Sequence, residues 1–213
     1  MKITILSDAG SWKNPFIEGL ARKLRRKGHG VVTTHHTTGV RKGEILFILG
    51  FFKIVPSDVL KRNKINIVVH ESALPKGRGW SPMSWLVVEG AREIPLTLFE
   101  AVEKVDAGRI YLRDRISLQG NELLPDIRAK VGVAMMKLCE KFVSAYPSIL
   151  TRGIIQAGKP SYYRRRTPGD SRLDSKKSIA SQFNALRVVD NDSYPAFFEY
   201  KGSIYTLKIE KKS

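Results

Sequence analysis

Short apolar runs alternate with amphipathic segments along the first half of this chain, and this alternation constrains its fold most. The runs at 44–50 (EILFILG) and 64–70 (KINIVVH) are too short for ordinary helices and predict strands buried on both faces. A strand is also predicted at 2–6, and residues 11–30 after it repeat apolar side chains at helical spacing. Strand, helix and strand in this order predict an α/β fold with a mostly parallel sheet.

The second half of the chain extends this sheet and then changes character. Two more strands are predicted at 94–102 and 109–116, and a long amphipathic helix at 122–145. After Pro147 the sequence becomes rich in Gly, Pro, Ser and charge, and Lys201-Gly202 marks the turn of a hairpin. We therefore expect two units, a Rossmann-like domain followed by a small C-terminal β subdomain, with the bounds 1–150 and 151–213.

Composition narrows the class of protein. The formal net charge of +17 favours an anionic partner, but it does not choose between nucleic acid, a membrane surface and a phosphorylated small molecule. Cys139 is the single cysteine, which excludes an internal disulfide and a cysteine-based zinc cluster. His35 and His36 are adjacent on a predicted strand, so their side chains face opposite sides and make a poor metal pair.

The chain carries no sign of a membrane span or of secretion. No apolar run approaches the roughly 18 residues that a transmembrane helix needs. The opening MKITIL turns polar at Ser7, which is too short for a signal peptide. We expect a cytoplasmic protein without membrane contact.

Three loops converge at one edge of the predicted sheet, at 8–14, 50–56 and 70–82. In open α/β sheets, ligands bind outside the carboxyl ends of the strands, which is where these loops lie. His70 ends a buried strand there and is either an active-site group or a satisfied structural histidine. Asp106, in the turn VDAGR, either joins such a site or only shapes the turn.

A spaced pattern of residues runs from His70 to Ile110. It reads His70-x-x-x-Leu74-Pro75-x-x-Arg78-Gly79-x-x-Pro82, then Glu89-Gly90, Thr97 and Asp106-x-Gly108-x-Ile110. The pattern resembles the formyltransferase family that uses 10-formyltetrahydrofolate, whose signature is Asn-x-His-Pro-Ser-Leu-Leu-Pro followed by an Asp-x-Gly turn. The resemblance covers roughly residues 44–115 and implies the Rossmann-like formyltransferase fold.

The resemblance implies that His70 and Asp106 are catalytic. His70 would donate a hydrogen bond to the oxyanion or accept the proton of the attacking amine, and Asp106 would orient it. The family's asparagine, two residues before the histidine, is Val68 here, and the following proline is Glu71. Asn66 is a third catalytic candidate on the same strand face, although the strand rise places it about 13 Å from His70. Either the pair suffices or another group supplies the missing amide.

The resemblance also implies where the two substrates bind. Folate is expected along the segment before the histidine strand and beside the catalytic aspartate, at Phe51, Phe52, Ile54, Val55 and Asp106. Substrate contacts are expected in the loops at the cleft mouth, at Ser11, Trp12, Lys76, Arg78 and Trp80. There, cations would meet a diphosphate and an aromatic face would stack on a base, although Arg78 could instead hold the loop shape. No metal is expected.

Two further segments favour one branch of the family. GRGWSPMSW and SYYRRRTPGDSRLD are similar to the bacterial nucleotide-sugar N-formyltransferases of the pseudaminic-acid type. This implies transfer of a formyl group to the amine of a nucleotide-linked amino sugar, most specifically a UDP-linked 4-amino-4,6-dideoxy sugar. The stretch YPAFFEY (194–200) offers either a homodimer contact or part of a core.

Two alternatives stay open at this point. Methionyl-tRNA formylation is favoured by the charge of +17 and opposed by the short C-terminal region, so nucleic acid is not the expected partner. A non-catalytic relative that only binds nucleotide or nucleic acid is favoured by Val68 in the asparagine position.

Overall fold

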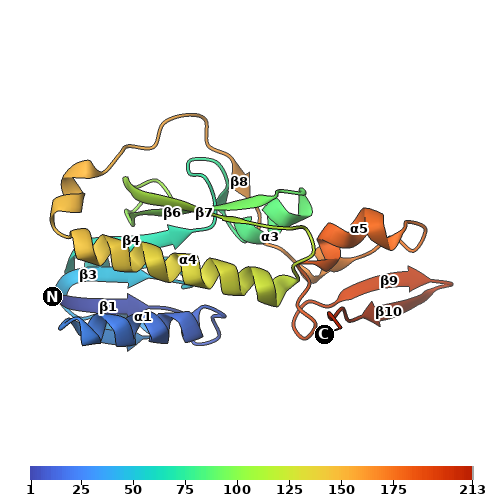
Figure 1. The fold of residues 1–213 in the computed structure, drawn as a ribbon, viewed down its shortest axis with the longest axis horizontal. Helices are drawn as coiled ribbons and strands as arrows, with labels where there is room; N and C mark the ends of the chain where they lie inside the picture. The colour runs from blue at the N-terminus through green and yellow to red at the C-terminus, as the bar shows by residue number, and fades with distance from the viewer. Residues whose placement is uncertain (213) are drawn as a thin grey trace.

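The computed structural model describes residues 1–212 as a layered α/β fold (Figure 1). The strands are β1 (Lys2–Leu6), β2 (Gly30–Thr34), β3 (Gly43–Ile48), β4 (Asn63–His70), β5 (Arg78–Gly79), β6 (Glu93–Glu100), β7 (Ile110–Ser117), β8 (Tyr162–Tyr163), β9 (Ala196–Tyr200) and β10 (Ser203–Leu207). The helices are α1 (Asn14–Arg26), α2 (Ser57–Leu60), α3 (Pro82–Val88), α4 (Leu124–Ala145) and α5 (Ile179–Leu186).

The central sheet has the strand order β2-β1-β3-β4-β6-β7. Its first four strands in this order run parallel. β6 is antiparallel to β4, and β7 at the edge is antiparallel to β6, so β7 again runs in the direction of the first four. The expected mostly parallel sheet is confirmed. Because parallel strands end at the same edge, the loops that follow β1, β3 and β4 all meet there.

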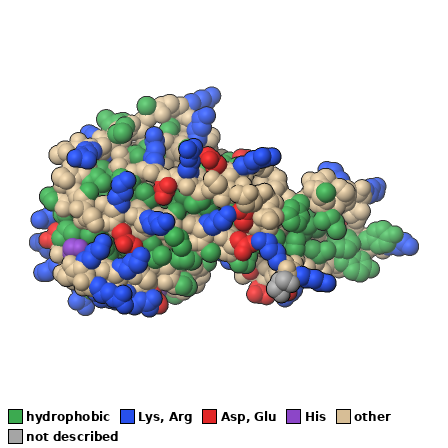
Figure 2. All heavy atoms as spheres, in the orientation of Figure 1, with side chains coloured by type: hydrophobic (Ala, Val, Ile, Leu, Met, Phe, Trp, Pro, Cys, Tyr) green, Lys and Arg blue, Asp and Glu red, His purple; other side chains and the backbone are tan. Residues whose placement is uncertain are grey.

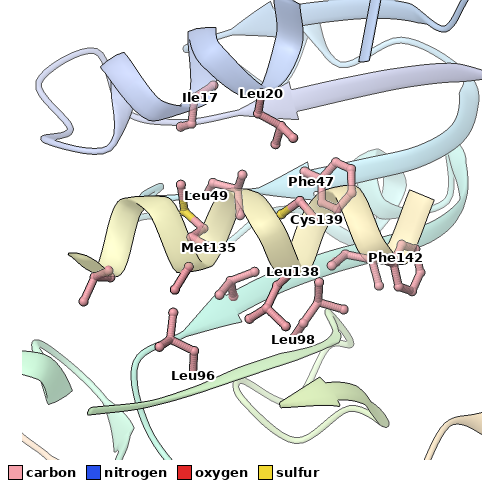
Figure 3. Packing of buried hydrophobic residues seen from close by; sticks show 14 of the residues in the cluster. Ile17, Leu20, Phe47, Leu49, Leu96, Leu98, Met135, Leu138, Cys139 and Phe142 are labelled. Carbon is pink, nitrogen blue, oxygen red and sulfur yellow. The ribbon is translucent and has the colours of Figure 1, made fainter. Parts of the chain in front are cut away.

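The main core lies between this sheet and the two longest helices, α1 and α4 (Figure 1). Apolar residues at helical spacing face the strands, as Figure 3 shows for Leu20 of α1 and for Met135, Leu138 and Phe142 of α4. Phe142 is fully buried, with its ring edge-on to Phe47 at 6.3 Å. Cys139 lies in the same layer, and burial raises the pKa of its thiol, which stays protonated.

The chain after α4 first returns to the sheet and then leaves it. Ile154 pairs with Ile110, and β8 pairs with β5, so residues 154–163 still belong to the first unit by their hydrogen bonds. The division at residue 150 stays a prediction. The predicted hairpin is formed by β9 and β10, with left-handed backbone at Lys201 (φ 48°) and Gly202 (φ 76°).

The hairpin and α5 have a small core of their own, beyond the carboxyl ends of the parallel strands (Figure 1). Its buried members are Leu186, Val189 and Ala196. Among residues 1–212, no helix is long and apolar enough to cross a membrane.

We predict that Phe142→Ala lowers the free energy of unfolding by about 3–5 kcal/mol, because it removes a large ring from a closed core. Val133→Ala on the same helix is the matched control, since Val133 is 41% exposed, and should change stability by less than about 0.5 kcal/mol. Urea unfolding of both variants measures the difference. Equal effects would contradict the described packing of α4.

Candidate functional site

His70 ends β4 and is buried, with a relative exposure of 8%. Its ring packs edge-on against Phe99 and sits opposite Thr97 of β6. The Nε2 atom lies 2.9 Å from the carbonyl oxygen of Gly77. A carbonyl can only accept, so Nε2 carries the hydrogen, and Nδ1 is the ring nitrogen that can accept a proton in the neutral form.

Asp106 approaches the same ring nitrogen from another loop. Its Oδ2 lies 3.9 Å from His70 Nε2, and both side chains are about nine-tenths buried. The same Oδ2 accepts a hydrogen bond from the backbone N–H of Gly79 at 3.0 Å. Asp106 has a left-handed backbone (φ 52°), which an aspartate in a tight turn tolerates. The structure thus brings together the two residues that the sequence spacing paired.

The loop after β4 is held by hydrogen bonds to residues 161–163, which lie far away in the sequence. Gly77 has a left-handed backbone (φ 72°), and its N–H donates to Ser161 Oγ at 2.9 Å. Arg78 and Trp80 donate backbone hydrogen bonds to the carbonyls of Ser161 and Tyr163. The carbonyl that receives His70 is therefore held by a strand more than 80 residues away in the sequence.

Asn66 is not brought to this pair. Its amide nitrogen donates to the carbonyl of Leu60 at 3.1 Å, and its backbone carbonyl accepts from Ala101. Val68 lies between Asn66 and His70 on the same strand face and packs against the apolar clusters on both sides of it. The surface of β4 in front of His70 is therefore apolar where the family has an amide.

The segment after β3 forms one wall of this region. Phe51 and Val55 pack against the sheet, whereas Phe52 and Ile54 are 56% and 80% exposed. Asp8 holds the segment in place, because its carboxylate accepts the N–H of Phe52 at 2.6 Å. Of the four folate contacts expected in this segment, Phe51 and Val55 are thus packed against the protein, and Phe52 and Ile54 are open to a ligand.

The expected substrate loop divides in a similar way. Trp80 is 38% exposed, stacks on Phe52 at 6.2 Å and lies under the guanidinium of Arg165. Lys76 is exposed. Arg78 is turned inward at 7% exposure, and its guanidinium donates to Gln156 Oε1 at 2.6 Å, so it holds the loop shape.

Ser11 and Trp12, expected at the cleft by position, lie in the loop that leads into α1. Ser11 is buried against Gly50, and its hydroxyl accepts the backbone N–H of Lys13. Trp12 packs edge-on against Phe16 and stands near the guanidinium of Arg128. Both residues stabilise the packing of this loop, and their contact with substrate stays a prediction.

A buried ion pair that the sequence did not reveal lies directly beside His70. Lys13 Nζ is 2.5 Å from Glu71 Oε1, and both side chains are about nine-tenths buried. Burial is the largest single influence and alone would raise the pKa of Glu71, but the charges of Lys13 and then His70 hold that pKa below its usual range. Glu71 therefore stays charged, and it ties the end of β4 to the start of α1.

The residues that the structure describes contain no group of three or more His, Cys, Asp or Glu side chains placed to hold a metal ion. The chemistry that this site supports from its own side chains is proton transfer by a histidine beside a carboxylate.

Comparison with known proteins agrees with this arrangement. Residues 20–139, more than half of the chain, match the family described as formyl transferase, and the chain belongs to that family. The expectation of a formyltransferase enzyme domain is confirmed at this level. Over 164 residues, or 75% of the chain, it is 29% identical to the bifunctional polymyxin resistance protein ArnA of Wigglesworthia glossinidia brevipalpis. It spans about a quarter (24%) of that relative's length.

Solved structures share the fold. A methionyl-tRNA formyltransferase from Clostridium thermocellum superposes with a TM-score of 0.79 over 100% of this chain and 94% of its own, at 17% identity. A 4-N formyltransferase from Francisella tularensis gives 0.77 over 100% and 98%, at 16% identity. At these identities the likeness confirms the Rossmann-like formyltransferase fold alone.

We predict that Lys13→Met destabilises the protein by about 3–5 kcal/mol at pH 7, because it leaves the Glu71 carboxylate buried without its cation. Because the lowered pKa of Glu71 is a folded-state property, the pair stabilises the protein above the unfolded carboxyl pKa, and this contribution is lost as pH falls through the folded value. In Lys13→Met the burial that raises the pKa of Glu71 is no longer offset by the lysine charge, so Glu71 of the variant takes up a proton at a higher pH than in the wild type. The penalty of Lys13→Met should therefore be smaller at pH 5 than at pH 7.

Lys23→Met is the matched control, since Lys23 pairs with Glu140 at 2.9 Å on the surface and is half exposed. It should change stability by less than about 1 kcal/mol. Urea unfolding of both variants at pH 7 and pH 5 measures the difference. A penalty for Lys13→Met that is small or independent of pH would show that the pair is not a buried ion pair.

Proposed function

We propose that this protein transfers a formyl group from 10-formyltetrahydrofolate to the amine of a nucleotide-linked amino sugar. The observation that carries the proposal is the buried pair of His70 and Asp106 at the carboxyl end of β4, in a chain of the formyl transferase family. The sugar we propose is a UDP-linked 4-amino-4,6-dideoxy sugar.

His70 would act as the general base of this transfer. The neutral amine attacks the formyl carbon, and the amine proton passes to Nδ1, because Nε2 already donates to Gly77. Asp106 stabilises the positive charge that the ring then carries. When the bond between the formyl carbon and N10 breaks, His70 returns the proton to N10. The products are the formamide and tetrahydrofolate.

The wall formed by residues 50–56 supports a folate site. Flat aromatic donors bind where exposed apolar side chains stand beside a closed floor, and Phe52 and Ile54 offer the first while Phe51, Val55 and Val68 form the second. These residues would orient the donor with its formyl carbon toward His70. The donor supplies the one-carbon unit, and the protein supplies position and proton transfer.

The loop at 76–80 supports a nucleotide-linked acceptor. Trp80 presents a partly exposed ring for a base, and Arg165 places a cation over this ring. Lys76 is an exposed cation of the same loop, and both cations are offered to a diphosphate. The 4-N formyltransferase from Francisella tularensis, which has the same fold, is a second support.

We predict that the protein, mixed with 10-formyltetrahydrofolate and a panel of UDP- and dTDP-linked amino sugars, yields a product heavier by one CO. His70→Ala and Asp106→Asn should each lower kcat by about 10²-fold or more, because one removes the base and the other its supporting charge. Mass spectrometry of the sugar and absorbance of tetrahydrofolate measure the two products.

Asp114→Asn is a control, since Asp114 is an exposed acid on β7. Full turnover in His70→Ala would overturn the proposed site.

Methionyl-tRNA formylation is a second candidate that the charge of +17 and the fold shared with the Clostridium enzyme favour. Turnover with charged tRNA alone, and a steep fall of its affinity with salt, would replace the sugar by RNA.

We further propose that two copies associate through the β9–β10 hairpin. Figure 2 shows apolar side chains gathered over this end of the molecule, and the exposed ones include Ile179, Tyr200, Ile204 and Tyr205. A two-stranded sheet with an open apolar surface is marginal by itself, and a second copy would cover it.

Sedimentation should therefore show a dimer at micromolar concentration. Ile204→Lys should convert it to a monomer, because a buried unpaired charge opposes the contact. Lys208→Glu, a change of charge on an exposed residue just beyond the hairpin, should leave the dimer intact. A wild-type monomer across this range would contradict the contact.

A further inference from the structure

We propose that Gln156 is a positioning residue that holds His70 and Asp106 in their relative geometry. The proposal rests on the catalytic roles assigned above to these two residues. Gln156 lies in the irregular segment that follows α4 and its 3₁₀ turn, 50 residues beyond Asp106. It is partly buried.

Both the nitrogen and the oxygen of the Gln156 side-chain amide bond to the two loops of the site. Its Nε2 donates to the carbonyl of Asp106 at 2.9 Å and to the carbonyl of Gly108 at 3.0 Å. Its Oε1 accepts from the guanidinium of Arg78 at 2.6 Å. A single side chain thus joins the turn that carries the carboxylate to the loop that carries the Gly77 carbonyl.

The turn around Asp106 needs such support. Its left-handed backbone is one that aspartate tolerates but rarely adopts, so neighbouring contacts are needed to hold the turn in this one conformation. Gly108 is pressed against the sheet, where an added Cβ would lie 1.9 Å from the carbonyl oxygen of Glu100. Two bonds from one amide nitrogen fix both ends of this turn and hence the direction of the Asp106 carboxylate.

The other end of the bridge acts on His70. Arg78 directly follows Gly77, whose carbonyl receives the His70 Nε2 hydrogen. Arg78 is 7% exposed, so loss of its Gln156 partner would leave a buried guanidinium group without that acceptor and would shift the loop. The separation of 3.9 Å between the His70 and Asp106 side chains therefore depends on Gln156, which contacts neither of these two side chains.

Two variants separate a positioning role from simple support of the fold. Gln156→Glu keeps the size and the acceptor for Arg78 but sets carboxylate oxygen against two carbonyls. Gln156→Ala removes the bridge. Both should lower kcat by about 10- to 100-fold, because a small displacement of catalytic groups has this effect. KM for donor and acceptor should stay within about threefold, since Gln156 is not among the residues proposed above to contact either substrate.

The matched control is Gln182→Ala. Gln182 of α5 forms the same kind of bridge, with its Oε1 accepting from the N–H of Asp174 at 2.7 Å and its Nε2 donating to the Asp174 carbonyl at 3.1 Å. It lies in the hairpin unit, away from His70. Its loss should leave kcat unchanged, even where it lowers the melting temperature.

A second measurement needs no substrate. In ¹⁵N-labelled wild-type protein, two-bond couplings between ring protons and nitrogens should place the neutral His70 hydrogen on Nε2. In Gln156→Glu the signal should shift toward a mixture of tautomers, while Gln182→Ala keeps the wild-type spectrum. An unchanged tautomer together with an unchanged kcat in Gln156→Glu would overturn the proposal.

The kinetic outcomes also separate this proposal from the catalytic site itself. Turnover that survives His70→Ala would remove the site, and Gln156 would then have nothing to position. Turnover that is lost in His70→Ala but kept in both Gln156 variants would leave the site in place and reject the bridge alone.

Discussion

The hydrogen bond from His70 Nε2 to the Gly77 carbonyl joins the two parts on which the site depends. One partner, His70, ends a central strand of the sheet and is fixed by the core, and the other, Gly77, lies in the turn directly before β5. The bond determines which ring nitrogen is free and where the ring lies relative to Asp106. The loop, in turn, keeps its shape through β8 and through Arg78.

The parallel sheet explains why the site forms at this edge. The four parallel strands end at the same edge of the sheet, so the loops that follow them lie side by side. The antiparallel strand β6 pairs Thr97 with His70 and so flanks the histidine on the side away from β3. The buried pair of Lys13 and Glu71 ties the end of β4 to α1, so the backbone on both sides of His70 is held. A rigid edge of this kind suits a reaction in which the protein mainly supplies position and one proton acceptor.

The fold was predictable from the sequence wherever apolar residues repeat at the spacing of a strand or a helix. Strands 2–6 and 64–70 and the helix over 122–145 follow from apolar spacing, because burial on one or two faces dictates that spacing. His70 and Asp106 were predictable from their spacing within a recognisable pattern. For Arg78 the sequence left open whether the guanidinium contacts a substrate or holds the loop, because an arginine in a basic loop carries no sign of where its guanidinium finds a partner.

Gln156 and the pair of Lys13 and Glu71 show the same limit. Each acts across more than 45 residues of sequence, and polar contacts over such distances leave no period that a single sequence could reveal. Val68 is the opposite case. The sequence showed that the family's amide is missing, and the structure shows an apolar surface in its place.

The most direct test of this account is a crystal structure of the protein with tetrahydrofolate and a UDP-linked 4-amino sugar bound together. The account predicts the sugar amine within about 3 Å of His70 Nδ1, with Nε2 still bonded to the Gly77 carbonyl. A ring turned so that Nε2 faces the amine, or an amine bound away from His70, would contradict it.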